Sequence, residues 1–137
     1  MFSITSGRQA EGDATMSLVE LCQNGDLEGV KAALQNGADV NTKNDKYGWT
    51  GLMKAMNFNH NSVVALLFNT PNIDVNLKEE KRGNCALHYA VKSENIESLK
   101  LLLNVPSIDV NSVNDDSQSA LHWAVEGNNI EKLKPKH

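Results

Sequence analysis

The stretch Gly83-Asn84-Cys85-Ala86-Leu87-His88-Tyr89-Ala90-Val91 decides the fold, because close variants of it occur before and after it at a nearly constant distance. Leu87 lies 35 residues after Leu52 and 34 residues before Leu121, and both of these leucines stand in matching segments. A second motif, Asp-Val-Asn, recurs at intervals of 35 residues starting from Asp39. A sequence period in the thirties predicts a repeat protein of the solenoid type.

Each period contains two short segments in which apolar residues recur at helical spacing, and Gly, Asn or Asp residues separate the two segments. The sequence therefore predicts helix pairs stacked side by side, without an extensive sheet. The first helix of each pair is expected to begin near Ser17, Gly51, Ala86 and Ala120.

These motifs resemble the ankyrin repeat, whose pattern opens with an acidic residue, a turn glycine and Thr-Pro-Leu-His, and closes with Asp-Val-Asn. The third copy matches well, with Gly83, Leu87 and His88 at the expected spacing. The copies also depart from the pattern, since Gly51 replaces the proline and Ser117 replaces the turn glycine. The resemblance implies an all-α ankyrin-repeat solenoid of helix-turn-helix units joined by hairpin-like turns.

The chain of 137 residues is long enough for one domain of four repeats. Residues 1–16 lack periodic apolar positions, so we expect a flexible leader. The ankyrin-repeat domain then covers residues 17–137, with repeats at about 17–43, 44–78, 79–113 and 114–137. The last repeat is incomplete because Pro135, Lys136 and His137 stand where the third repeat has leucines. Three outcomes are open for this end: a frayed last helix in a monomer, self-association through the apolar edge that is left uncovered, or a chain that is a fragment of a longer array. We expect fraying of the last helix together with weak self-association.

Composition and charge limit the classes of binding partner and the cellular compartment to be expected. A formal net charge of −4 disfavours binding to duplex nucleic acid or to an anionic membrane, both of which call for a basic surface. The N-terminal residues lack the apolar core of a secretory signal, and the chain lacks an apolar run as long as a membrane span. Cys22 and Cys85 stand at non-equivalent repeat positions, so we expect two reduced thiols. Together these features predict a cytoplasmic or nuclear protein.

Candidate catalytic and metal-binding residues are few. His88 and His122 occupy the same motif position in successive repeats, and the spacing provides no further ligands for a metal. Ser119 and His122 are three residues apart because the fold motif places them so. The resemblance implies that such a histidine hydrogen-bonds locally and ties neighbouring turns together. We therefore expect no enzymatic activity, no cofactor and no metal.

The resemblance also implies a binding surface. In ankyrin-like folds the turn residues beside the glycine, and the residue before the alanine of the first helix, face the concave surface. Here these positions hold four aromatic residues and one arginine, residue types that anchor interfaces. The candidate partner-binding residues are Lys46, Tyr47, Trp49, Lys54, Lys81, Arg82, Asn84, Tyr89, Asp115, Asp116, Gln118 and Trp123. The sequence thus predicts a non-enzymatic scaffold that binds another protein or a peptide segment through its concave groove and turn tips.

Two alternatives remain open for these residues. In one, Trp49 and Trp123 merely pack against the neighbouring turns. In the other, the groove binds a small ligand or an oligonucleotide, with Trp49 and Tyr89 stacking on bases and Lys46, Lys54 and Arg82 meeting phosphates. By resemblance, an ankyrin domain that binds a nucleotide near a Gly-Trp-Thr turn is a precedent for the turn that contains Trp49.

Overall fold

The computed structural model describes residues 16–44 and 47–126. Within these ranges the chain forms helices and two very short strands. In chain order they are α1 (Leu18–Asn24), α2 (Leu27–Gln35), β1 (Lys43–Asn44), β2 (Trp49–Thr50), α3 (Gly51–Asn57), α4 (Asn61–Phe68), α5 (Ala86–Lys92), α6 (Ile96–Leu103) and α7 (Ala120–Glu126). The leader up to residue 15, Lys46, and the part of the fourth repeat from residue 127 onward lie outside the described residues.

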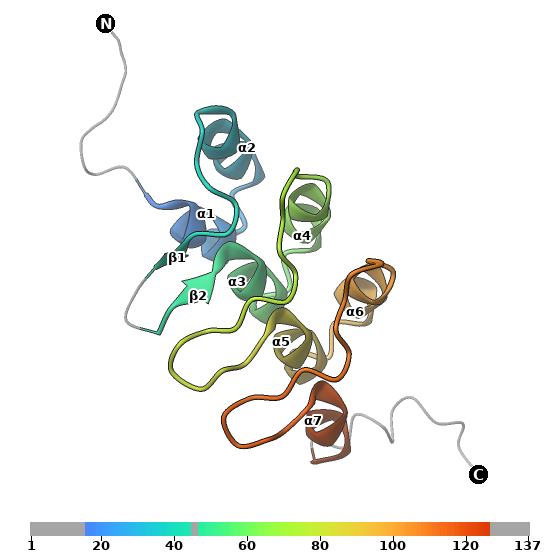
Figure 1. Cartoon of the computed structure of the whole chain (residues 1–137). Coiled ribbons are helices and arrows are strands. Elements are labelled where there is room, and N and C mark those ends of the chain that lie inside the picture. The colour runs from blue at the N-terminus through green and yellow to red at the C-terminus, as the bar shows by residue number, and fades with distance from the viewer. Residues whose placement is uncertain (1–15, 45–46, 127–137) are drawn as a thin grey trace, which may run out of the picture.

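The helices form two parallel rows (Figure 1). The first helices α1, α3, α5 and α7 contact one another in sequence, and the second helices α2, α4 and α6 form the other row. The turns between successive repeats project from the row of first helices, on the side away from the second helices (Figure 1). The prediction of an all-α solenoid is confirmed, and the first helices begin at or next to the residues that the sequence indicated.

Polar side chains cap the N-termini of these helices. The Ser17 hydroxyl accepts the backbone N–H of Glu20 at 3.1 Å, and the Glu20 carboxylate accepts the Ser17 N–H at the same distance. Thr50 caps α3 in the same manner by accepting the Met53 N–H at 3.3 Å. Each bond satisfies a backbone donor that has no partner inside the helix, which is worth about 1 kcal/mol. Short helices of seven residues depend on such caps and on packing.

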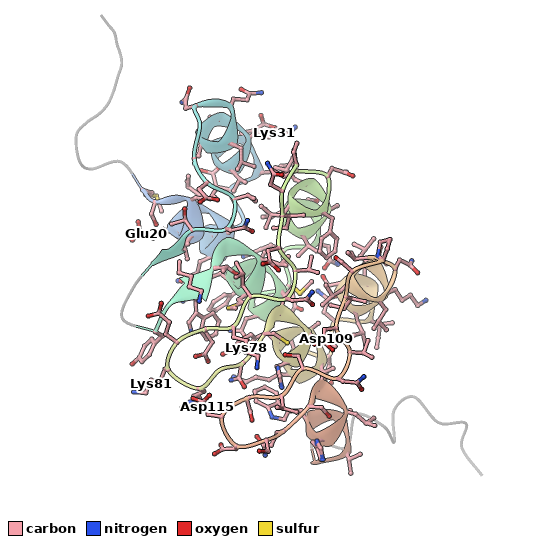
Figure 2. All side chains as sticks on the ribbon, viewed as in Figure 1. Glu20, Lys31, Lys78, Lys81, Asp109 and Asp115 are labelled. Carbon is pink, nitrogen blue, oxygen red and sulfur yellow. The ribbon has the colours of Figure 1, made fainter. Side chains whose placement is uncertain are left out.

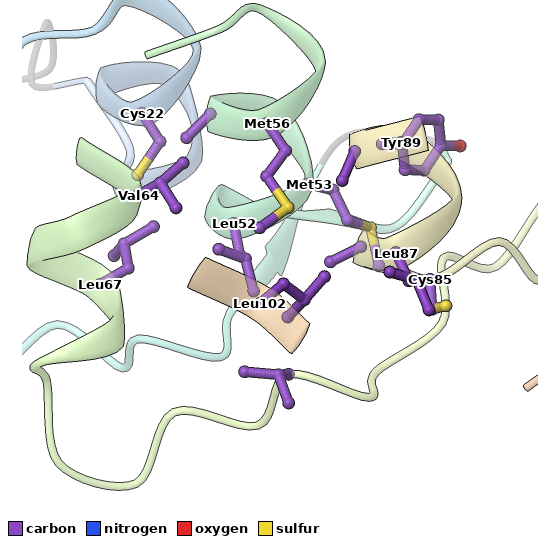
Figure 3. Close-up of a cluster of buried hydrophobic side chains, with 14 of the residues drawn as sticks. Cys22, Leu52, Met53, Met56, Val64, Leu67, Cys85, Leu87, Tyr89 and Leu102 are labelled. Carbon is purple, nitrogen blue, oxygen red and sulfur yellow. The ribbon is translucent and has the colours of Figure 1, made fainter. Parts of the chain in front are cut away.

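The hydrophobic core runs between the two rows. Met53 and Met56 of α3, Leu67 of α4 and Leu102 of α6 are fully buried, and Figure 3 shows them in one continuous cluster. Burial of an apolar side chain of this size contributes roughly 1.5–3 kcal/mol. Because each repeat shares this core with its neighbours, the stability of one unit depends on the next.

Gly51 illustrates how closely the first two repeats approach. A Cβ atom at this position would lie 2.7 Å from the Sγ atom of Cys22 in α1, well inside van der Waals contact. The buried Cys22 side chain therefore fills the space that the proline of the ankyrin motif would need. Both described cysteines are free thiols, as the sequence indicated, and burial raises the pKa of Cys22 to about 12.

The face beyond α7 is apolar and open. Leu121 is 65% exposed, whereas Leu52 and Leu87 at the same motif position are 2% and 4% exposed. Val110 of the Asp-Val-Asn motif is likewise 48% exposed, although its two equivalents are buried. Between α5, α6 and α7 lies a cavity of about 350 Å³, and its lining is almost wholly apolar. Within the described part of the chain, a residue at a given motif position is thus buried where a further repeat follows it and exposed where none does.

Candidate functional site

The turns that carry the predicted site are held by short backbone ladders. In the second turn β1 pairs antiparallel with β2, and in the third turn Lys78 and Cys85 form a single bridge. Gly48 and Gly83 stand at the bends with φ of +71° and +76°, a conformation that glycine adopts without strain. These glycines are also where the adjacent turns approach, since a Cβ on Gly83 would lie 2.6 Å from a carboxylate oxygen of Asp115.

Successive turns are stitched together by backbone hydrogen bonds. The N–H of Glu80 donates to the carbonyl of Tyr47 at 2.8 Å, and the N–H of Asp115 donates to the carbonyl of Arg82 at 2.8 Å. Lys81 lies at the outer end of the third turn and Asp115 lies on the adjacent fourth turn (Figure 2). Hydrogen bonds between segments 33 residues apart give a continuous, rigid edge rather than independent loops.

A cleft of about 160 Å³ opens between the second and third turns. We call it the turn cleft; its lining residues are Tyr47, Trp49, Glu79, Lys81, Arg82 and Tyr89. All but Glu79 belong to the site predicted from the sequence. The fold therefore brings together residues from two repeats that lie 30 or more positions apart.

Glu79 was missed by the sequence analysis, because it lies in the charged run Lys78-Glu79-Glu80 that reads as a solvated turn. In the structure it is only 3% exposed. Its carboxylate accepts the N–H of Arg82 at 2.6 Å and the hydroxyl of Tyr89 at 2.8 Å. The amide of Asn84 donates to it at 3.3 Å. These three donors replace the water that a carboxylate loses on burial, so Glu79 fixes the shape of the third turn.

Two members of the predicted site are placed differently from the expectation. Asn84 and Tyr89 were expected to face the groove, but they are 1% and 2% exposed. Their polar atoms are used inward: the Asn84 amide donates to the Tyr89 oxygen at 3.2 Å, and both side chains donate to Glu79. Burial and the neighbouring Glu79 carboxylate raise the pKa of Tyr89, so its hydroxyl stays a donor. Asn84 and Tyr89 therefore contribute to the binding surface by holding other residues in place.

The exposed part of the site combines aromatic rings with cations. The ammonium of Lys54 lies 4.4 Å from the centroid of the Trp49 ring, and the ammonium of Lys81 lies 5.0 Å from that of Tyr47. Trp49 also contacts Tyr89, with 4.3 Å between the ring centroids and 37° between the planes. Such cation–π contacts hold each ammonium close to the cleft while leaving it partly solvated.

The fourth turn carries the remaining predicted residues. Trp123 is half-buried and donates its indole N–H to the side-chain oxygen of Gln118 at 3.1 Å. Asn114, which the sequence analysis did not single out, is 7% exposed and donates to Asn84 at 2.9 Å, so it joins the third and fourth turns. Asp115 and Asp116 are exposed. The fourth turn is therefore acidic on its surface, and Trp123 serves the packing of the turn.

Cys85 and His88 form a close thiol–imidazole pair, with 3.2 Å between Sγ and Nδ1. The backbone N–H of Cys85 also donates to Nδ1, so the ring hydrogen lies on Nε2 and is donated to the Gln118 carbonyl at 2.8 Å. Both side chains are buried, and Ser119 and His122 repeat the arrangement. This pair caps α5 and ties it to the next turn, as the resemblance implied, and it lacks the access that a nucleophile needs.

In the described ranges, no group of three or more His, Cys, Asp or Glu side chains could hold a metal ion. Among the same residues, no helix is both long and apolar enough to cross a membrane.

Helix pairs in two rows, with hydrogen-bonded turns along one side, define a class of repeat protein that presents a preformed surface. The family model of ankyrin repeats (3 copies) matches residues 18–114 and again residues 77–134, and this chain belongs to the ankyrin-repeat family. It is similar to the human (Homo sapiens) 2-5A-dependent ribonuclease, with 35% identity over 63 residues. That match covers 46% of this chain but only 8% of the ribonuclease, so the similarity concerns a small part of the longer protein.

Proposed function

We propose that this chain is a non-enzymatic interaction scaffold that binds a partner protein through the turn cleft and the adjacent turn tips. Ankyrin repeats are generally protein–protein interaction modules and are generally not catalytic. Two features of the molecule support the more specific proposal. Hydrogen bonds already join the turns without a partner, and the cleft presents the residue types that dominate interface energies.

The observation that carries the proposal is the turn cleft itself. Tyr47 is 38% exposed at its edge, Trp49 is half-buried beside it, and Lys81 and Arg82 are exposed on the opposite turn. An aromatic surface bordered by cations is costly to leave in water, and a partner gains from covering it. Because Glu79 and the turn hydrogen bonds already fix the cleft, little conformational freedom is lost on the scaffold side.

The test is a comparison of partner capture by matched surface variants. Tyr47→Ala with Trp49→Ala removes the aromatic wall of the cleft, and Glu97→Ala with Lys100→Ala changes exposed residues of α6 in the second row. We expect the first pair to weaken binding by about 2 kcal/mol or more and the second pair to have little effect. Circular dichroism must show that both variants remain folded. Loss of binding only in the α6 variant would contradict the proposal.

A second candidate function is binding of a small ligand or an oligonucleotide at the same cleft. The observation in its favour is the similarity to a protein whose name describes a ribonuclease that depends on 2-5A. The geometry supports it less well. Tyr89 is 2% exposed and engaged with Glu79, and the Trp49 ring already contacts Tyr89 and Lys54, so base stacking would require rearrangement.

Titration with 2-5A distinguishes the two candidates. Saturable quenching of tryptophan fluorescence that disappears in Trp49→Phe and falls steeply with added salt would establish the second candidate. The first candidate predicts that 2-5A produces no saturable change at concentrations where a protein partner binds.

Two further parts of the proposal concern assembly and location. Weak self-association through the open apolar face beyond α7 is supported by the exposure of Leu121 and Val110. A cytoplasmic or nuclear location is supported by the two free thiols.

A further inference from the structure

The turn cleft is the centre of a basic patch on a chain whose formal net charge is −4. We define the basic cluster as Lys54, Lys81, Arg82 and Lys92. Each of the three lysines lies over a ring that lines the cleft: Lys54 over Trp49, Lys81 over Tyr47 and Lys92 over Tyr89. Arg82 lines the cleft itself. Four cations from two repeats therefore converge on one place.

Three members of this cluster lack a carboxylate partner in the part of the chain that the structure describes. Among the described residues, Lys81, Arg82 and Lys92 form no ion pair with a carboxylate. Glu79 lines the same cleft as a buried carboxylate whose oxygens accept hydrogen bonds from the turn itself. Glu80 is exposed on the same turn. Asp115 lies beside Gly83 on the adjacent turn. The four cations of the basic cluster still outnumber the three carboxylates of Glu79, Glu80 and Asp115, so a partner with negative charge is attracted to the cleft.

From this charge complementarity we infer that the partner binds through an acidic peptide segment, which places Asp or Glu side chains against the basic cluster and an apolar or aromatic side chain in the turn cleft. The inference rests on the proposed function and specifies the chemistry of its partner. Arg82 offers a planar donor pair that matches a carboxylate, and the lysines held over the rings act as point charges around it.

A peptide fits these observations better than a nucleic acid strand. The rings that would stack on bases already have neighbours: Lys54 lies over Trp49, Lys81 lies over Tyr47, and Tyr89 is buried. A strand that continued along the turn tips would also meet Asp115 and Asp116, both exposed, on the fourth turn. A short acidic segment can end before these aspartates or place a basic residue against them.

The experiment uses the full chain and three fluorescein-labelled probes of equal length. The first is a peptide of alternating Glu and Asp around one central Tyr, the second has Lys in place of every acidic residue, and the third is single-stranded oligo(dA). Fluorescence anisotropy is measured at low and at physiological salt. We expect the acidic peptide to bind, its affinity to fall with salt, and the basic peptide to bind at least about tenfold more weakly.

Charge-reversal variants locate the site. Arg82→Glu and, separately, Lys81→Glu should each weaken binding of the acidic peptide by about tenfold or more, since each replaces an attraction by a repulsion. The matched control is Lys100→Glu, which makes the same change in net charge on an exposed residue of α6 and should leave binding within about twofold. The use of two reversals guards against a folding defect in either one.

The outcomes separate the inference from the proposed function. Equal binding of the two peptides, tighter binding of oligo(dA), or an equal loss in Lys100→Glu would overturn the inference. If partner capture depends on Tyr47 and Trp49 but is indifferent to Arg82→Glu and Lys81→Glu, the proposed function stands and the acidic partner is wrong. If capture is indifferent to all four residues, the proposed function fails as well.

Discussion

At the scale of single residues, Ser117 shows that a departure from the repeat motif introduces backbone strain. It replaces the turn glycine and adopts φ of +61°, a left-handed conformation that costs a residue with a Cβ about 1 kcal/mol or more. Asn59, Asn72 and Glu94 also have positive φ. Asparagine tolerates this region better than serine or glutamate does, so Ser117 and Glu94 are the strained members of the set.

We therefore predict that Ser117→Gly raises the free energy of unfolding by about 0.5–1 kcal/mol, because relief of strain exceeds the added entropy of glycine in the unfolded chain. The matched control is Asp116→Gly on the same turn, where φ is negative and the same substitution should destabilise. Urea denaturation of the three proteins measures both effects. A loss of stability in Ser117→Gly would show that the strain is not real.

Glu79 is the second residue whose role appears only in the folded chain. In Glu79→Gln the amide nitrogen would face a donor in either orientation: the Arg82 N–H on one side, or Tyr89 and Asn84, which share the other carboxylate oxygen at 2.8 and 3.3 Å. We expect a loss of about 1–3 kcal/mol in unfolding free energy, the cost of an unsatisfied buried polar group. The neighbouring Glu80→Gln, at an exposed position, should change stability by less than about 0.5 kcal/mol. Equal effects of the two substitutions would contradict the assignment.

At the scale of elements, an asparagine ladder joins the loops that follow the second helices. The Asn41 side chain donates to the Asn72 carbonyl and accepts the Asp74 N–H, both at 2.8 Å. Asn76 makes the same pair of bonds to Ser107 and Asp109, at 2.8 and 2.9 Å. Each asparagine of the Asp-Val-Asn motif thus reaches one repeat ahead and satisfies two backbone groups that no helix provides for.

The asparagine ladder predicts that replacement by alanine has different effects on stability at two equivalent motif positions, Asn76 and Asn111. Asn76→Ala removes both bonds and should lower the unfolding free energy by about 1–2 kcal/mol. Asn111→Ala serves as the control, because within the described residues the Asn111 side chain makes no such bridge, and its effect should lie within about 0.5 kcal/mol. Chemical denaturation with one probe for the whole domain checks the pair. Similar losses in both variants would show that the bridges are not what stabilises the loop.

At the scale of the whole molecule, the two ends of the stack differ. The first repeat presents polar side chains such as Glu20, Asn24 and Lys31 to solvent. The opposite end of the described stack exposes Leu121 and Val125, at 65% and 53%. An apolar face gains little from contact with a polar one, so two copies should meet through like ends, which closes the assembly at a dimer.

We predict that sedimentation equilibrium shows average mass rising with concentration from one copy towards two, and no further. Leu121→Glu should keep the protein monomeric, because it places an unpaired charge in the centre of the contact. Gln35→Glu, an equal change in charge at an exposed position of α2, is the control and should associate like the parent. A strictly monomeric parent protein at high concentration would refute this arrangement.

The sequence by itself determined the period, the two helices in each of the first three repeats and, to within one residue, the start of each first helix. These follow from local rules: apolar spacing along a helix, caps such as Ser17 and Thr50, and glycines at the bends. The sequence also predicted most of the residues that line the turn cleft, because equivalent positions in successive repeats must lie side by side in a solenoid.

Only the tertiary structure decided which of these residues face solvent. Tyr89 and Asn84 stand at positions that read as surface, yet they are buried by contacts with Glu79 within their own repeat and with Asn114, Trp49 and Trp123 from neighbouring repeats. Leu52 and Leu121 share a motif position but are 2% and 65% exposed. Exposure depends on what the adjacent repeat places opposite a side chain, and that partner lies some 30 residues away, beyond the reach of local spacing or composition.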